Sequence, residues 1–264
     1  MRPFGQITID DILNEVRAVK KLCNGDNINI VRVTNHGTIQ RSFYFIDMEL
    51  CNHNLETYMM ELQWVPTAEV WDIMKDVANG LTYIHAQSQV HRDLKPRNSS
   101  HQIFKVDCLV LYSKHDQLWK VGDFGLTAEG TSKKKWTTRY MRGTSSYRAP
   151  ELIREQHFTN KVDIFAFGCI LFEAAFSEKA FRDDFYVDRY ASGSDLVYPT
   201  TPQSVRNEND VKEVKALIEM ALDVDPSRRP KAQELHQTLF ALGTRERSEL
   251  DLRVQEDGTD GKLL

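Results

Sequence analysis

The stretch His91-Arg92-Asp93-Leu94-Lys95-Pro96-Arg97-Asn98 decides the fold of this chain. Two shorter motifs follow it in order, Asp123-Phe124-Gly125 and Ala149-Pro150-Glu151. Either tripeptide alone would carry little weight, because short motifs occur by chance. An eight-residue match that is followed by both tripeptides in this order rarely arises by chance. We therefore interpret the three motifs as parts of one inherited site.

The polar side chains of these motifs suit the transfer of a phosphoryl group, a reaction that depends on positioning and charge neutralisation. Asp93 can accept the proton of an attacking hydroxyl, and Lys95 can bring positive charge to the transferring group. Asn98 and Asp123 offer the oxygen ligands that Mg²⁺ prefers, and the phosphates of a nucleotide would complete its shell. We therefore expect catalytic roles for Asp93, Lys95 and Asn98, and metal ligation by Asn98 and Asp123.

The motifs resemble those of the eukaryotic protein kinase family over about residues 10–242. Lys95, and Gly143-Thr144 ahead of Glu151, resemble its serine/threonine branch more than its tyrosine branch. The resemblance implies ATP and Mg²⁺ as cofactors, a protein substrate with Ser or Thr hydroxyls, and an upstream activating kinase. It also implies an α+β fold, with an incomplete small β lobe containing one helix and a mainly α-helical large lobe.

The resemblance further implies roles for single residues. Met48 falls at the gatekeeper position, and Glu49, Leu50, Cys51, Leu111 and Asp123 would bind the nucleotide. The implied regulatory and structural positions are Glu15 in the regulatory helix, His91, Arg92, Phe124 and Gly125 in the motifs, Thr138 and Thr144 in the activation segment, Asp163 beneath the catalytic loop, and Glu151 with its partner Arg229.

Two features of the sequence depart from the family pattern. Nine residues precede the helix expected to carry Glu15, and they contain neither a glycine-rich loop nor a lysine-bearing strand. Residues 99–109 separate Asn98 from the apolar strand that normally follows it, and they read as an insertion. We therefore expect an N-terminally truncated small lobe and impaired phosphate transfer.

Two other functions stay open at this stage. A catalytically inactive pseudokinase that acts as a protein-binding or scaffold module fits the absent lysine and glycine-rich loop, although Asp93, Asn98 and Asp123 are retained. A small-molecule phosphotransferase fits less well, because the long segment that ends at Glu151 is typical of a platform for peptide substrates.

Hydrophobic periodicity predicts the elements around these motifs. The first expected helix begins at Thr8–Asp11 and ends before Asn24. The second spans residues 67–87, with Thr67 as N-cap, and the third is a buried helix at 162–176. Two more helices are expected at 210–224 and 231–242. The expected strands are 28–33 and 43–49, joined through Asn35-His36-Gly37, and a pair at 109–112 and 118–121; residues 127–147 read as a long loop.

These elements divide the chain into three regions. Residues 1–53 are the expected remnant of the small lobe, and 54–243 form the large lobe, with the insertion at 99–109 and the activation segment at 123–151. Residues 244–264 read as a polar, disordered tail.

Composition excludes some functions. The 264 residues carry a net charge of −4, which gives no electrostatic case for nucleic acid or an anionic membrane as a partner. The four cysteines show no metal-ligand spacing and read as reduced thiols, and a cytoplasmic or nuclear location is the default expectation. Lys133-Lys134-Lys135 reads as a solvated stretch or a contact for an acidic partner, and phosphorylation of nearby Thr137, Thr138 or Tyr140 could engage Arg92.

Overall fold

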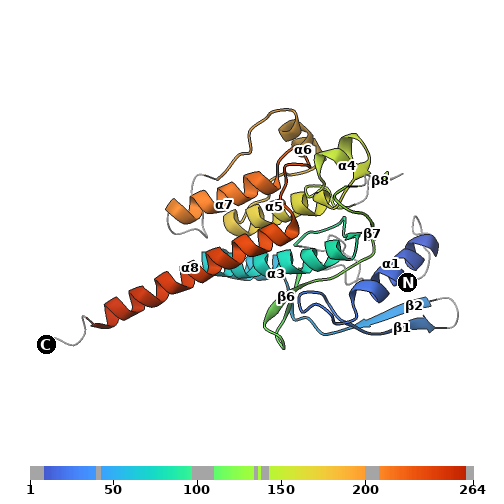
Figure 1. Ribbon diagram of the computed structural model, residues 1–264, viewed down its shortest axis with the longest axis horizontal. Helices are drawn as coiled ribbons and strands as arrows, with labels where there is room; N and C mark the ends of the chain where they lie inside the picture. Colours follow the sequence, from blue (N-terminus) through green and yellow to red (C-terminus); the bar gives the residue numbers. More distant parts are fainter. Residues whose placement is uncertain are drawn as a thin grey trace.

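The computed structural model describes residues 9–39, 43–96, 110–133, 136–137, 143–199 and 208–259, with the backbone alone described at 9–12, 43 and 249–259. Figure 1 shows one helix and a two-stranded ribbon at one end of the molecule and a larger helical body beside them. This is the expected α+β architecture with a small and a large lobe.

The small end contains α1 (Ile9–Leu22), β1 (Val33–Ile39) and β2 (Phe43–Met48). The remaining helices are α2 (Leu55–Leu62), α3 (Thr67–Ala86), α4 (Pro150–Arg154), α5 (Lys161–Phe176), α6 (Asp184–Ala191), α7 (Glu208–Ala221) and α8 (Ala232–Thr259). The remaining strands are β3 (His53–Asn54), β4 (Gln89–Val90), β5 (Val110–Ser113), β6 (Leu118–Val121), β7 (Ala128–Glu129), β8 (Trp136–Thr137) and β9 (His157–Phe158).

The first strand lies later in the chain than the sequence predicts. Residues 28 and 29 form a turn, and Ile30 makes a single parallel bridge with Val121 of β6, whereas β1 begins at Val33. The predicted connection through Asn35-His36-Gly37 is wrong, because these residues pair with β2 in antiparallel register. A Cβ on Gly37 would lie 2.9 Å from the ring of Phe45, so glycine there permits close packing rather than a turn.

Helix α5 forms the centre of the large lobe, as its apolar run predicts. Every residue of α5 except Glu173 is buried, which is the pattern of a helix surrounded by other elements. A Cβ on Gly168 would lie 2.9 Å from Ala221, so this glycine lets α7 approach closely. In α3, the predicted apolar face is buried as expected, at Val70, Met74, Val77, Ala78, Leu81 and Ile84.

Two helix ends differ from the prediction. The N-cap of α3 is Pro66 rather than Thr67, and its side chain makes no capping hydrogen bond. Helix α8 continues to Thr259, although the sequence predicts its end at Leu242 and a disordered tail from residue 244. In Figure 1 this helix extends beyond the helical body toward the C-terminus.

A buried carboxylate joins α3 to β6. Asp76 is 6% exposed and accepts a hydrogen bond of 3.0 Å from the backbone N–H of Trp119. Burial raises the pKa of Asp76 to about 6, although the bond from Trp119 acts in the opposite direction. In the unfolded chain an aspartate titrates near 4, so the native state holds this proton more tightly.

We expect this raised pKa to make Asp76→Asn more stable than the unsubstituted chain above pH 6. Native Asp76 keeps its proton between about pH 4 and pH 6 while the unfolded chain loses it, so its contribution to stability falls as the pH rises through that window. Urea unfolding should show no difference near pH 4 and a gain of about 2 kcal/mol at pH 7.5. A constant difference across the range would contradict the assignment.

Candidate active site

A buried carboxylate on α5 holds the catalytic loop in place. Asp163 is 1% exposed and accepts the backbone N–H groups of His91 at 2.9 Å and Arg92 at 2.8 Å. Its Oδ2 also lies 2.9 Å from His85 Nε2 at the end of α3. Burial acts to raise the pKa of Asp163, but the hydrogen bond and charge of His85 outweigh it and lower that pKa. The two N–H bonds support Arg92 in the left-handed region, at φ 73°.

His91 connects the catalytic loop to the Asp123-Phe124-Gly125 motif. Its side chain is fully buried, and Nε2 lies 2.9 Å from the carbonyl oxygen of Gly122. Its ring packs 5.5 Å from that of Phe124, centroid to centroid. A carbonyl can only accept, so Nε2 carries the proton, and His91 acts as a packed structural residue.

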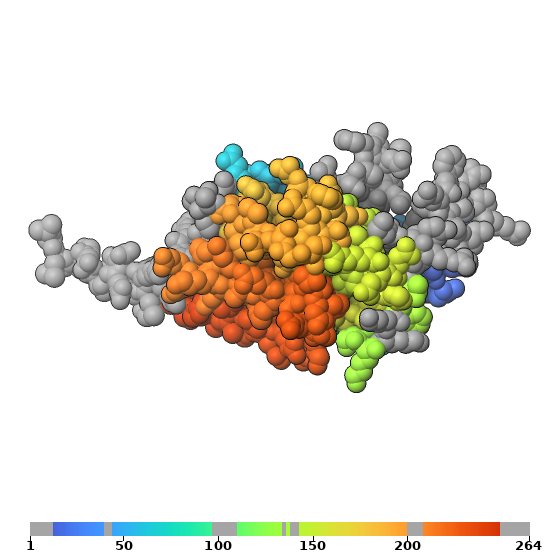
Figure 2. Space-filling model, turned by 90° about the horizontal axis from the view of Figure 1, so that it is seen from above, coloured from blue at the N-terminus to red at the C-terminus, as the bar shows by residue number. Residues whose placement is uncertain are grey.

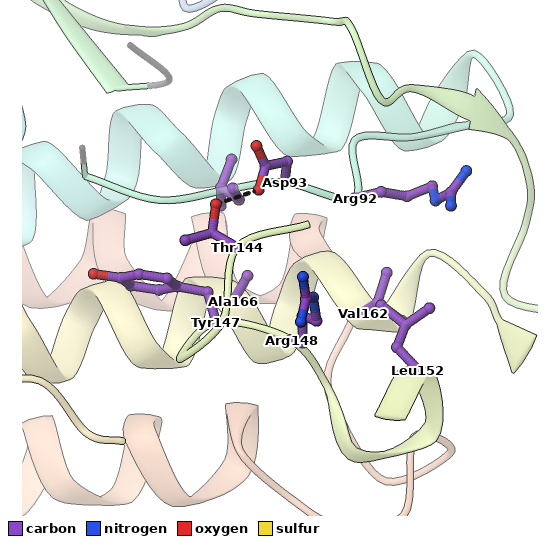
Figure 3. A pocket seen from close by; sticks show the side chains of 9 residues that line it. Arg92, Asp93, Thr144, Tyr147, Arg148, Leu152, Val162 and Ala166 are labelled. Atoms are coloured by element: carbon purple, nitrogen blue, oxygen red, sulfur yellow. Dashed lines mark hydrogen bonds between the residues drawn. The ribbon is translucent and has the colours of Figure 1, made fainter. Parts of the chain in front are cut away.

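The side chains of Asp93, Lys95 and Thr144 form a closed triangle. Lys95 Nζ donates to Asp93 Oδ2 at 2.7 Å and to Thr144 Oγ1 at 2.6 Å. The Thr144 hydroxyl in turn donates to Asp93 Oδ1 at 2.7 Å. Figure 3 shows Asp93 and Thr144 pointing toward each other, while Arg92 points away. The base and the cation proposed from the sequence therefore contact each other, and both contact Thr144.

Contacts on both sides fix the loop that carries Thr144. A Cβ on Gly143, whose φ is +95°, would lie 2.7 Å from the carbonyl oxygen of Arg92, so only glycine fits there. Arg148 donates to the Gly143 carbonyl at 2.5 Å and to Asp184 of α6 at 2.5 Å. This bridge ties the end of the activation segment to the helical lobe.

Two carboxylates converge beside Gly125. A Cβ on this glycine would lie 3.2 Å from Asp123 Oδ1 and 3.6 Å from Glu15 Oε2. The Gly125 N–H also donates to Asp123 Oδ1 at 3.1 Å. Glu15 of α1 is therefore placed next to the predicted metal ligand Asp123, and the absence of a side chain at Gly125 permits this approach.

The side chain of Glu49, at the predicted hinge, forms an ion pair that the sequence did not indicate. Both of its carboxylate oxygens lie 2.9 Å from Lys120 Nζ, and Oε1 also accepts from the Arg32 N–H. Lys120 further contacts Asp116 at 2.5 Å. Burial acts to lower the pKa of Lys120, but its hydrogen bonds to Asp116 and Glu49 outweigh it and raise that pKa. A lysine inside the otherwise apolar strand β6 was the signal that could have revealed this network.

We expect Lys120→Met to destabilise the chain, because it leaves the 11%-exposed Glu49 carboxylate without its cation. The expected loss in the free energy of unfolding is about 3 kcal/mol, as for a buried pair that loses one partner. Urea unfolding of Lys120→Met, Glu49→Gln and the double variant would give the coupling energy, with exposed Lys114→Met as control. Additive losses would show that the pair contributes nothing.

The other predicted nucleotide contacts surround this hinge. Leu111 in β5 is 8% exposed, whereas Leu50 is 81% and Met48 38% exposed. Cys51 is half-buried, and burial followed by the charge of Glu49 raises the pKa of its thiol to about 11. The hinge therefore offers an apolar surface and a thiol that stays protonated at neutral pH.

Glu151 of α4 and Arg229 form a bidentate ion pair, with bonds of 2.7 and 2.9 Å. Arg229 is 1% exposed and also donates to the carbonyl oxygens of Asp223 and Lys161. Its guanidinium lies 5.0 Å from the centre of the Phe165 ring. This pair joins the end of the activation segment to the loop before α8.

Several predicted positions lie outside the described residues: Asn98, the segment 99–109, Cys108, Lys134, Lys135, Thr138 and Tyr140. Within the part that the structure describes, no group of three or more His, Cys, Asp or Glu side chains could hold a metal ion by itself. No helix of this part is long and apolar enough to span a membrane.

Comparisons with known proteins identify the family. Residues 4–241 match the protein kinase domain. The chain is similar to the serine/threonine-protein kinase VIK of Arabidopsis thaliana, at 31% identity over 230 residues, or 85% of this chain and 49% of that protein. It is also similar to the membrane-associated tyrosine- and threonine-specific cdc2-inhibitory kinase of Drosophila melanogaster, at 28% identity over 227 residues, or 84% of this chain and 37% of that protein.

The chain belongs to the protein kinase family, because the matched domain spans most of its length. A third relative, the putative mitogen-activated protein kinase kinase kinase 7-like of Drosophila melanogaster, is 28% identical over 237 residues, or 86% of this chain and 55% of that protein. The chain thus spans between about a third and about half of these three relatives. Members of the family generally use ATP and Mg²⁺ and act on protein substrates.

Proposed function

We propose that this chain is the catalytic domain of a serine/threonine protein kinase, which transfers the γ-phosphate of ATP to Ser or Thr hydroxyls of a protein. The observation that carries the proposal is the triangle of Asp93, Lys95 and Thr144. It brings an acceptor for the substrate's proton within hydrogen-bonding distance of a lysine that can balance the phosphate charge.

Each residue of the site has a stated task in this proposal. Asp93 orients the attacking hydroxyl and accepts its proton, and Lys95 steadies the transferring phosphoryl group. The backbone and side chains of residues 49–51 seat the adenine. Asp123, with Asn98, would hold Mg²⁺, which when bound neutralises the charge of the nucleotide phosphates. The convergence of the Asp123 and Glu15 carboxylates beside Gly125 suits a site that takes a cation.

We further propose that these 264 residues, assayed by themselves, transfer phosphate slowly. The sequence ahead of Glu15 contains no glycine-rich loop to cover the phosphates and no strand lysine to pair with this glutamate. Misalignment of the reacting groups alone can lower a rate by orders of magnitude.

Transfer of radiolabelled phosphate from ATP to a generic basic protein tests the proposal. We expect slow, Mg²⁺-dependent labelling that EDTA abolishes, with phosphoserine or phosphothreonine in the acid hydrolysate. Phosphotyrosine as the main product would contradict the serine/threonine assignment. Rapid labelling at rates typical of a complete kinase would contradict the proposed impairment.

The second candidate function is a catalytically inactive pseudokinase that acts as a protein-binding or scaffold module. The feature that favours it is the segment 99–109, which separates Asn98 from the apolar strand that normally follows it. Thermal unfolding with and without Mg²⁺-ATP separates the two. A raised melting temperature together with labelling supports the kinase, because only a ligand that binds the native state stabilises it. No shift and no labelling would favour the binding module.

A further inference from the structure

A second, larger hollow lies on the helical lobe. It has a volume of about 610 Å³, within the range of sites that bind small molecules and peptide side chains. It shares no lining residue with the small hollow at Asp93. In Figure 2 the yellow-green residues near 150–160 lie beside the orange-red residues near 225–235, and both groups contribute to its walls.

The walls of this hollow are firmly held. Glu151 and Arg229 join two of its sides through the bidentate ion pair. Lys161 Nζ donates to the carbonyl oxygens of Arg229 and Pro230, which fixes the loop before α8 against the start of α5. A site with a fixed shape loses little conformational entropy when a ligand binds. The hollow is therefore suited to specific binding.

The hollow combines an apolar surface with exposed cations. Phe158, Pro226 and Val224 line it, and Val224 is 40% exposed. Lys133 of the activation segment and Lys231 before α8 are exposed lining residues. Neither lysine forms an ion pair with any residue that the structure describes.

Positive charge around the hollow exceeds the negative charge available to neutralise it. Lys161, a third lining lysine, has only carbonyl partners in the described part of the chain. Burial, and less strongly the charges of Arg229 and Lys231, lower the pKa of Lys161 although Glu234 opposes them. The lining carboxylates already have partners of their own: Glu151 binds Arg229, Asp225 accepts from the Ser227 N–H and lies 4.0 Å from Arg228, and Glu155 has an interaction of its own. An anionic ligand would therefore complete the charge balance.

We propose that this hollow binds an acidic peptide segment of a partner protein, with one apolar side chain against Phe158, Val224 and Pro226. Carboxylates on either side of that side chain would face Lys133 and Lys231. The charge of the hollow favours such a ligand over a basic or purely apolar one. The proposal does not rest on phosphate transfer by the chain, because the hollow and the Asp93 triangle have no residue in common.

Fluorescence anisotropy would test this site on the full chain. The probe is a fluorescein-labelled peptide with a Leu-Phe pair between two blocks of Asp and Glu. We expect saturable binding that weakens at least tenfold in Lys231→Glu and in Lys133→Glu. Lys212→Glu makes the same charge change at a 74%-exposed side chain on α7, away from the hollow, and should leave binding nearly unchanged.

A second pair of variants tests the apolar contact. Val224→Asp should weaken binding at least tenfold, whereas Met220→Asp, at a similarly exposed position on α7, should have little effect. Both lysine variants should keep the melting temperature of the unsubstituted chain, since their side chains are exposed. Three results would overturn the proposal. The first is no saturable binding, and the second is equal weakening in Lys212→Glu. The third is that inorganic phosphate displaces the peptide and that the Leu-Phe pair can be replaced without loss of affinity.

Discussion

Arg229→Ala should lower the free energy of unfolding by about 3–5 kcal/mol, as expected when a buried ion pair loses one partner. The substitution leaves the Glu151 carboxylate, which is 11% exposed, without its two charge-assisted hydrogen bonds. It also removes the donors to the carbonyl oxygens of Asp223 and Lys161. A single domain has a total stability of about 5–15 kcal/mol, so much of the variant could be unfolded at 37 °C.

The neighbouring arginine provides a matched control. Arg228 has a side chain that is 74% exposed and lies 4.0 Å from Asp225. Arg228→Ala should change the free energy of unfolding by less than about 0.5 kcal/mol, because such surface pairs contribute little. Urea unfolding followed by circular dichroism measures both variants. Similar losses in the two would show that the buried pair has no special role.

Asp93→Asn should reduce the rate of phosphate transfer by about 10²–10⁴-fold, the usual contribution of a general base. Asparagine has nearly the same shape and can still accept the hydrogen bond from Thr144. It cannot accept a proton at neutral pH, and it removes the ionic partner of Lys95. The initial rate of labelling at saturating Mg²⁺-ATP is the measurement.

Two controls separate chemistry from folding in this variant. Asp72→Asn removes an exposed carboxylate on α3 and should leave the rate unchanged. The shift in melting temperature on adding Mg²⁺-ATP should be similar in Asp93→Asn and the unsubstituted chain, because Asp93 is not a proposed metal ligand. A variant that keeps more than half of the original rate would remove Asp93 from its proposed role.

The sequence predicts the large lobe well where burial dictates the pattern. Helices α3 and α5 follow from apolar spacing, since α3 buries one face and α5 is buried all round. The ribbon of β1 and β2 was harder to predict, because β1 has no buried residue and shows no clean alternation. The sequence of residues 28–31 looks more like a strand, but residues 28 and 29 form a turn, and the backbone bonds to β6 join Asn29 and Val31 to Val121. Local pattern could not show which partner each segment would find.

The residues of the candidate site could be predicted only where they belong to a recognisable sequence motif. The resemblance gave catalytic roles to Asp93 and Lys95 and put Thr144 in the activation segment. Their closed triangle depends on Gly143 and Arg148, which bring that segment back to the catalytic loop. Lys120 was missed because its role arises from contacts with Glu49 and Asp116, which lie on other parts of the chain. Short helices such as α6 were also missed, since eight residues give too few turns for a clear periodicity.

The carboxylate of Asp163 has a consequence for how the catalytic loop moves. It accepts two successive backbone N–H groups, and it belongs to a helix that is buried on nearly every side. The amide hydrogens of His91 and Arg92 can therefore exchange with solvent only when that part of the core opens, on the slow time scale of large unfolding events. The part of the site that holds Asp93 therefore opens only as often as the core of the large lobe unfolds. Faster motions of the part that covers the nucleotide would leave it in place.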